Sequence, residues 1–219
     1  MTKRLAEDPQ KKAAILKTAL HEFAINGYGA STDLIAVKAG VSKGTVFRYF
    51  ANKATLYSEV VDAALDNVMN QADLTVWTES TDLVSMIVRA TQYKLELAQR
   101  FPDEFALLIA VYKNDDNLPD GSGENLHRTF GQWTKENVDR LINPVFDRLK
   151  IRPELDKQVV RRYLLNNVKS MTERAQSYLQ SHPDVKSIDQ MTELITEIKM
   201  EMDIIEHGIV ANGSGDDLY

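Results

Sequence analysis

The fold is decided by residues 31–50, which have the sequence STDLIAVKAGVSKGTVFRYF. Two short helices are predicted in this stretch, because Ser31 and Ser42 are each suited to cap a helix N-terminus. Gly40 lies between them and is the residue type that most easily takes a left-handed turn. Two helices that cross at roughly 90–120° need a small residue at their contact and a glycine in the turn. Because Ala36 and Gly40 occupy those places, the stretch predicts a helix-turn-helix.

The motif is expected to pack against a preceding helix. That helix is predicted to begin after Asp8-Pro9, which combines a capping side chain with a proline suited to the first helical position, and to end at Asn26-Gly27. Asn52 is expected to cap a longer helix that links the motif to the rest of the chain. The apolar residues that should hold the motif against the first helix are Ile35, Ala39, Val41, Val46 and Phe50.

The rest of the chain also has a helical hydrophobic period of about 3.6 residues, and no stretch of strict alternation predicts a strand. We therefore expect an all-α fold of about nine helices. Later helices are expected near residues 81–100, 102–113, 124–149, 153–181 and 185–207, with a polar loop at 113–123. The predicted domains are a helix-turn-helix domain at 1–55, a larger helical domain at 56–210 and a disordered tail at 211–219.

The charges are unevenly distributed along the chain, whose formal net charge is -6. Residues 1–60 hold nine Lys or Arg and five Asp or Glu, which gives +4 for this segment. Residues 61–219 hold seventeen against twenty-seven, which gives -10. Binding to nucleic-acid phosphates is driven by Lys and Arg. The pattern is typical of a basic nucleic-acid-binding head, residues 1–60, on an acidic body.

Several classes of protein are disfavoured by the composition. The chain has no cysteine, and its four histidines, His21, His127, His182 and His207, are not at the spacing of metal ligands, so we expect no metal and no cofactor. A Gly-rich phosphate loop, a Gly-x-Ser-x-Gly motif and a paired His–carboxylate site are all missing, which argues against an enzyme. Without a secretory signal or a run of about 18 apolar residues, the expected location is the cytoplasm and no membrane partner is expected.

The second helix of a helix-turn-helix enters the DNA major groove, and its N-terminal residues contact base edges. Its first turn, with Lys43 and Gly44, presents free N–H groups and a positive charge that suit a phosphate, and the glycine allows close approach. Lys43 and Arg48 are expected to donate hydrogen bonds to guanine or phosphate. Thr45 or Phe47 is expected to contact a thymine methyl group.

Two further residues complete the predicted DNA site. Lys53, at the start of the following helix, is expected to hold the DNA backbone. For Tyr49 two interpretations stay open, namely packing within the protein and contact with a phosphate.

The motif and its surroundings resemble the N-terminal signature of the TetR family of repressors. The resemblance implies an all-helical homodimer that binds a palindromic double-stranded DNA operator. It also implies a C-terminal domain that binds a small-molecule effector and then loosens the grip on DNA, and a phosphate contact for Thr32. The residues that carry it are Phe23, Gly27, Tyr28, Ser31, Thr32, Ile35, Ala36, Ala39, Gly40, Val41, Ser42, Lys43, Gly44, Thr45, Tyr49, Phe50 and Lys53.

The two C-terminal helices, near 153–181 and 185–207, carry broad apolar stripes. Such stripes usually form a core, and the resemblance implies that these two also form a four-helix dimer interface. A two-fold interface would set two recognition helices about 34–36 Å apart, one turn of DNA. The stripe residues are Val159, Val160, Tyr163, Leu164, Val168 and Met171 on one helix, and Ile188, Met191, Leu194, Ile195, Ile198, Met202 and Ile205 on the other.

A ligand pocket is one of two interpretations of the apolar residues on the middle helices. Ordinary core is the favoured one, because pockets and cores are lined by the same side chains. The candidates are Tyr93, Phe105, Leu108, Tyr112, Phe130 and Trp133. Two other functional hypotheses stay open: a DNA-binding regulator controlled by a protein partner without a small ligand, and an enzyme with an incidental helix-turn-helix.

Overall fold

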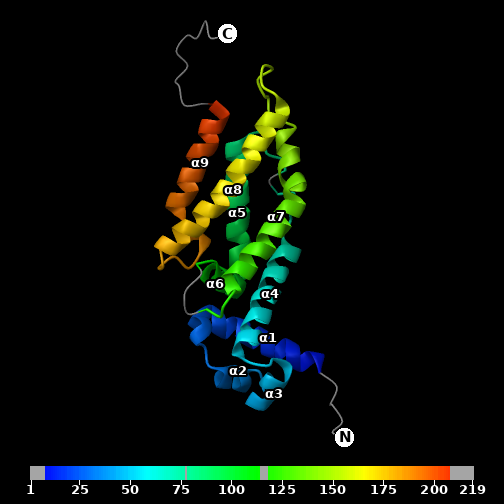
Figure 1. The fold of residues 1–219 in the computed structure, drawn as a ribbon, viewed down its shortest axis with the longest axis vertical. Coiled ribbons are helices and arrows are strands. Elements are labelled where there is room, and N and C mark those ends of the chain that lie inside the picture. Colours follow the sequence, from blue (N-terminus) through cyan, green and yellow to red (C-terminus); the bar gives the residue numbers. More distant parts are fainter. Residues whose placement is uncertain (1–7, 77, 114–117, 208–219) are drawn as a thin grey trace. The chain divides into compact units, whose positions relative to one another are not determined.

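The computed structural model describes residues 8–76, 78–113 and 118–207. Within these ranges it holds nine α-helices, two short 3-10 helices and no strand, which confirms the all-α prediction (Figure 1). Residues 114–117 of the polar loop and the predicted tail at 211–219 lie outside the described residues. The elements are α1 (Pro9–Asn26), η1 (Gly27–Gly29), α2 (Thr32–Lys38), α3 (Lys43–Tyr49), α4 (Lys53–Gln71), α5 (Leu83–Arg100), α6 (Pro102–Tyr112), α7 (Ser122–Phe146), α8 (Lys157–Ser181), η2 (Ile188–Gln190) and α9 (Thr192–His207).

The four N-terminal helices begin where their capping residues predict. The Asp8 carboxylate accepts from the N–H groups of Gln10 and Lys11 at the start of α1. Ser31, Ser42 and Asn52 cap α2, α3 and α4 in the same way, each accepting a backbone N–H three residues later. Side-chain capping satisfies N–H groups that the helix itself leaves unpaired.

Two predicted helices begin later than expected. The helix expected from residue 153 begins at Lys157, because Leu155 N–H bonds Arg152 in a turn and Asp156 then caps the helix through the N–H groups of Gln158 and Val159. The helix expected from residue 185 begins at Thr192, because residues 182–191 form a turn and the 3-10 helix η2.

The chain forms two compact units. The first comprises residues 1–72, 97–133 and 179–187, and the second comprises residues 73–96, 134–178 and 188–219. Each unit therefore combines segments that are separate in the sequence, whereas the predicted domains divide the chain by sequence order after residue 55.

The core of the first unit joins the helix-turn-helix to α1, α4 and α6. Phe23 of α1 and Tyr28 of η1 both meet the ring of Tyr57 in α4 edge to face, with ring centroids 4.8 and 5.2 Å apart. Leu107 and Val111 of α6 are buried in the same cluster. As the sequence predicts, Ile35, Val46 and Phe50 are fully buried there, and Ala39 and Val41 pack against them.

The core of the second unit is built from α5, α7, α8 and α9. Its buried residues are Leu83, Met86, Val145, Leu164 and Met202. Arg174 of α8 and Glu201 of α9 form a two-pronged ion pair, which fixes these two helices to each other. Among the helices of the described residues, none is long and apolar enough to cross a membrane.

Candidate nucleic-acid interface

Helix α3 turns one side into the core and another side to solvent. Val46 is buried within it, and Phe50, which ends it, is also buried. Lys43, Gly44 and Arg48 are exposed, while Thr45, Phe47 and Tyr49 are half-buried. The α3 residues predicted to contact DNA are therefore all at least partly accessible.

Lys43 forms an ion pair within the protein. Its Nζ lies 2.9 Å from Oδ2 of Asp33 in α2. Both side chains are more than half exposed, at 52% and 67%, so the pair is worth little, about 0–1 kcal/mol. Lys43 can therefore exchange the carboxylate for a phosphate at low cost.

Gly44 is not required by the fold of the protein itself. It lies inside α3 without a positive φ, and an added Cβ would meet only the Ser42 hydroxyl, at 3.9 Å. A glycine inside a helix costs roughly 1 kcal/mol relative to alanine. Open space on the outer side of α3 is what a closely approaching partner needs.

Thr45 contributes to the cap of α3. Its N–H donates to the Ser42 hydroxyl at 3.1 Å, and the two hydroxyl oxygens lie 2.9 Å apart. The cap holds the first turn of α3 in place, and with it Lys43 and Gly44.

Tyr49 packs within the protein, which supports the first of its two interpretations. Its hydroxyl accepts a hydrogen bond from the backbone N–H of Asp8 at 2.8 Å and donates one to the carbonyl of Asp8 at 3.2 Å. The guanidinium of Arg48 lies over the Tyr49 ring, 5.2 Å from its centroid. Arg48 thus has an aromatic surface that orients it.

Lys53 and Thr32 lie at the starts of α4 and α2, the helices that follow and precede α3 in the chain. Lys53 is the first residue of α4, and its Nζ lies 4.7 Å from the centre of the Tyr28 ring. Burial lowers the pKa of Lys53. Thr32 is the first residue of α2 and is half-buried. The predicted phosphate contacts of both residues stay predictions.

Comparison with known proteins connects this geometry to a family. Residues 15–60 match the family model of bacterial regulatory proteins, tetR family. Residues 15–60 are thus similar to the N-terminal part of tetR-family regulators. The matched segment runs from the middle of α1 to the first half of α4, and it contains the whole helix-turn-helix. The match supports the expectation of a regulator and speaks against the enzyme hypothesis.

Two curated relatives match part of this chain. The HTH-type transcriptional regulator YhgD of Bacillus subtilis is 39% identical over 64 residues, which are 29% of this chain and 34% of that protein. The HTH-type transcriptional regulator RutR of Escherichia coli K12 is 36% identical over 93 residues, or 42% of this chain and 43% of that protein. The chain thus matches less than half the length of these relatives.

A solved structure extends the likeness in fold beyond the head. A tetR-family transcriptional regulator from Streptomyces coelicolor superimposes with a TM-score of 0.57, over 91% of this chain and 83% of that one. At 17% sequence identity, this similarity shows the fold alone.

The six ligand candidates are divided between the two compact units. Tyr93 belongs to the second unit, where its hydroxyl accepts the N–H of Asp73 at 2.6 Å. The others belong to the first unit: Phe105, Leu108, Tyr112, Phe130 and Trp133. Three of these, Leu108, Tyr112 and Phe130, pack against the core of that unit, which favours the core interpretation.

Aromatic contacts of this group involve α6 and α7. Tyr112 stacks on His127 with ring centroids 4.4 Å apart, and Phe130 stacks on Trp133 at 6.1 Å. Burial raises the pKa of Tyr112. The rings therefore have partners inside the protein.

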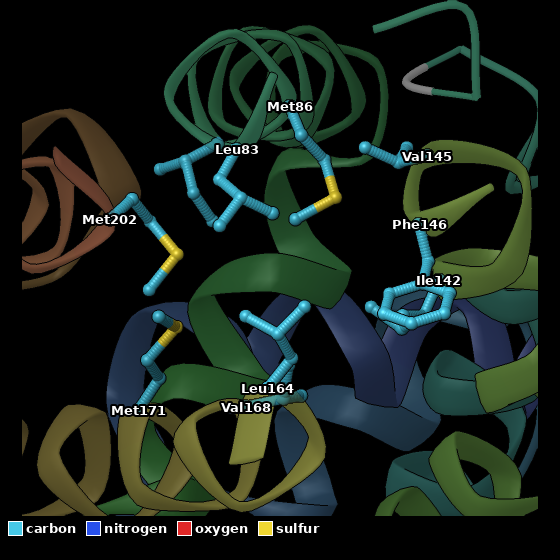
Figure 2. A pocket seen from close by; sticks show the side chains of 10 residues that line it. Leu83, Met86, Ile142, Val145, Phe146, Leu164, Val168, Met171 and Met202 are labelled. Carbon is cyan, nitrogen blue, oxygen red and sulfur yellow. The ribbon is translucent and has the colours of Figure 1, made fainter. Parts of the chain in front are cut away.

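A cavity in the second unit is lined by residues that the sequence did not single out as ligand contacts. Its volume is about 30 Å³, and Met86 of α5, Met171 of α8 and Met202 of α9 point toward it (Figure 2). A water needs about 10–15 Å³ on this measure, and ligand pockets are usually about 300–1,000 Å³. The other lining residues are Leu83, Ile87, Ile142, Val145, Phe146, Leu164 and Val168. In the sequence these positions look like any core stripe, so no signal marked them as pocket residues.

Proposed function

We propose that this chain is a transcription regulator of the tetR type, which binds a palindromic operator as a homodimer in the cytoplasm. The observation that carries the proposal is the match of residues 15–60 to the tetR-family model, in a segment whose helix α3 exposes Lys43 and Arg48 while Val46 is buried. The basic charge of residues 1–60 supports a phosphate-bearing partner.

Exposed apolar side chains on α8 and α9 support the dimer. Val159 and Tyr163 lie one turn apart on α8 and are 51% and 55% exposed. Met200 and Ile204 lie one turn apart on α9 and are 55% and 45% exposed. Leu164, Leu194 and Met202 of the predicted stripes enter the protein's own core. The exposed side chains belong to the predicted stripe on α8, whereas those on α9 lie outside it, and both pairs stay available for a second copy.

A small apolar effector is the proposed signal. The cavity of the second unit is lined only by Leu, Ile, Val, Met and Phe, so it offers no hydrogen-bonding side chain. Methionine is unbranched and flexible, and the three that face the cavity would let it widen around a ligand. In a thermal-shift screen, an apolar compound that binds only the folded protein raises the Tm. If no compound raises the Tm, control by a protein partner is the better hypothesis.

The experiment that tests the function is selection of bound sequences from a random DNA pool at about 0.15 M salt, where non-specific attraction is screened. The expected result is a palindrome whose half-sites are about one turn, or 10–10.5 base pairs, apart. Failure to enrich any sequence would contradict the proposal.

The Lys43–Asp33 pair gives a sharper prediction for the site. Lys43→Ala should weaken binding to all sequences and reduce the salt slope of binding by about one. Asp33→Asn should have the opposite effect on affinity, because it frees Lys43 from its carboxylate partner.

Arg48→Ala should relax preference at particular base pairs. Binding titrations at several salt concentrations check all three, and equal effects of Lys43→Ala and Arg48→Ala on every sequence would refute the assigned roles.

A further inference from the structure

A polar cleft between α4 and α7 has room for a small ligand. Its volume is about 290 Å³, whereas the apolar cavity of the second unit has about 30 Å³. Ligand pockets usually measure roughly 300–1,000 Å³, so the polar cleft is close to the lower end of that range. Its lining lies wholly within the first unit and consists of Asp62, Leu65, Asp66, Asn125, Arg128 and Thr129.

The two walls of the polar cleft carry opposite charges. Asp62 and Asp66 of α4 supply two carboxylates one turn apart, and Arg128 of α7 supplies a guanidinium. The amide of Asn125 connects the walls, because its Nδ2 donates to Oδ1 of Asp62 at 3.2 Å and its Oδ1 accepts from Arg128 at 2.5 Å. The polar cleft therefore offers one wall to a cation and the other to an anion.

The base of the polar cleft is fixed by the core of the first unit. Leu65 of α4 and Leu126 of α7 are both buried in the same core cluster, at 5% and 4% exposure. The two helices are thus packed against each other where the polar side chains meet. A site on packed helices holds its binding groups in a defined geometry before any ligand arrives.

The α4 wall has an excess of negative charge. Partial burial raises the pKa of Asp62, and the negative charges of Asp66 and Glu59 raise it further. Arg128 and the hydrogen bond from Asn125 act in the opposite direction without cancelling this effect. An opposite charge nearby favours the ionised form of a carboxyl group. An ammonium group in the polar cleft would therefore be stabilised by this wall.

We propose that the polar cleft binds a small zwitterion of the amino-acid class, which carries a primary ammonium group and a carboxylate. The ammonium lies against Asp62 and Asp66, and the carboxylate accepts hydrogen bonds from Arg128, whose planar guanidinium suits a carboxylate. A ligand with a positive charge alone would bring a like charge towards Arg128. A ligand with a negative charge alone would meet the two carboxylates of α4.

A ligand bound here acts on the helix that follows the recognition helix α3. α4 begins at Lys53, shortly after Phe50 ends α3, and its Leu56, Tyr57 and Val60 are buried in the core that also holds Phe50. A zwitterion that ties α4 to α7 favours one placement of α4. By linkage, zwitterion and operator then change each other's affinity by the same factor. The effect on DNA rests on the proposed function, whereas binding to the polar cleft does not.

Calorimetric titration of the full chain tests the site. The probe is γ-aminobutyrate, with β-alanine and ε-aminocaproate as zwitterions of shorter and longer charge separation. Butylamine and butyrate, which each keep one of the two charges, are the matched control ligands. The best of the zwitterions should bind about tenfold or more tightly than either control, because it alone gains both charged hydrogen-bonding contacts. If no zwitterion binds, or if butylamine binds as tightly as the best one, the proposal is overturned.

Two substitutions at exposed positions assign the walls. Asp66→Asn should weaken binding of both the best zwitterion and butylamine. Arg128→Gln should weaken binding of the zwitterion about tenfold and leave butylamine binding no weaker, since the ammonium is held by α4. Glu96→Gln and Lys135→Gln remove the same charges at exposed positions outside the polar cleft, and should keep the affinities of the parent. An equal loss of both ligands in Arg128→Gln would refute the role of the guanidinium.

Operator titrations test the link to the head. The best zwitterion, at saturation, should change the operator affinity of the parent about fivefold or more, and at the same concentration should have little effect on Arg128→Gln. Unchanged operator affinity in the parent would overturn the action on α4. If the parent enriches no DNA sequence, the proposed function is wrong, and calorimetry still decides whether the polar cleft binds the zwitterion.

Discussion

Glu22 of α1 is a carboxylate buried in the head. It is only 2% exposed, and its partners are Nζ of Lys38 at 2.5 Å and Nδ2 of Asn26 at 3.4 Å. Lys38 ends α2, so this ion pair ties the first helix of the helix-turn-helix to α1. The lysine side chain is 48% exposed, and it can return to water when the pair is broken.

Because Glu22 is buried and Lys38 is half exposed, replacing one or the other should lower the free energy of unfolding by different amounts. Lys38→Met leaves a buried carboxylate without its cation and should lower the free energy of unfolding by about 1–3 kcal/mol, because the half-exposed site tempers the penalty of a fully buried charge. Glu22→Gln keeps a hydrogen-bond acceptor and leaves Lys38 to solvent, so it should cost about 1 kcal/mol or less. Urea unfolding measures both. A larger loss in Glu22→Gln would refute the assignment of the carboxylate as the vulnerable partner.

The sequence predicts residues of the site but not the side chains and backbone groups that they bond. Lys43, Arg48 and Tyr49 could be selected because the spacing of a helix-turn-helix is local. Their partners could not be found in this way. Lys43 bonds the side chain of Asp33, which is ten residues away in the sequence, and Tyr49 bonds the backbone of Asp8, which is 41 residues away. Only the folded head brings such groups together.

At the scale of the element, the turn between α2 and α3 depends on one backbone conformation. Gly40 has φ +68°, and an added Cβ would meet nothing within 4 Å. A substitution there is therefore opposed by backbone strain and not by crowding. Gly44 differs, because it has ordinary helical geometry and an added Cβ would meet only the Ser42 hydroxyl, at 3.9 Å.

Replacing Gly40 by alanine should lower stability, whereas replacing Gly44 by alanine should raise stability and weaken DNA binding. Gly40→Ala should lower the free energy of unfolding by about 1–2 kcal/mol through left-handed strain. Gly44→Ala should raise it by up to about 1 kcal/mol, since alanine favours a helix, and should weaken operator binding by crowding the DNA. Thermal unfolding and DNA titration of the same preparations check the pair. Tighter operator binding by Gly44→Ala would contradict the close approach of DNA to α3.

The elements themselves could be predicted to different degrees, depending on how local their start signals are. Asp8, Ser31, Ser42 and Asn52 cap helices within three residues of chain, so the sequence predicts the starts of the four N-terminal helices. The start of α9 at Thr192 depends on a turn and a 3-10 helix at 182–191, which the period of the apolar residues does not predict. The cavity of the second unit brings together four helices distant in sequence, and no local pattern distinguishes such a cavity from core.

At the scale of the whole molecule, the proposed function requires two heads at a fixed spacing. A palindromic operator presents its half-sites about 34–36 Å apart, and a two-fold interface elsewhere in the chain has to hold the recognition helices at that separation. The apolar side chains that α8 and α9 leave exposed, Val159, Tyr163, Met200 and Ile204, are the surface proposed for it.

Charges on this surface should therefore dissociate the dimer without unfolding the protomer. In the double variant Tyr163→Asp/Met200→Asp, both altered side chains are already more than half exposed, so the core loses nothing, whereas a dimer would have to bury four carboxylates. Analytical ultracentrifugation should show a monomer, and affinity for the palindrome should fall at least tenfold because the second head no longer binds at high effective concentration.

Binding to a single half-site separates this effect from damage to the head. The variant should bind an isolated half-site as well as the parent protomer does, since α3 is untouched. Lys135→Asp, at an exposed position of α7, is the matched control and should leave both the dimer and the palindrome affinity unchanged. A variant that stays dimeric would place the two-fold interface on another surface. If the variant is monomeric and keeps its affinity for the palindrome, each head binds DNA independently. The dimer interface then does not set the spacing of the two half-sites.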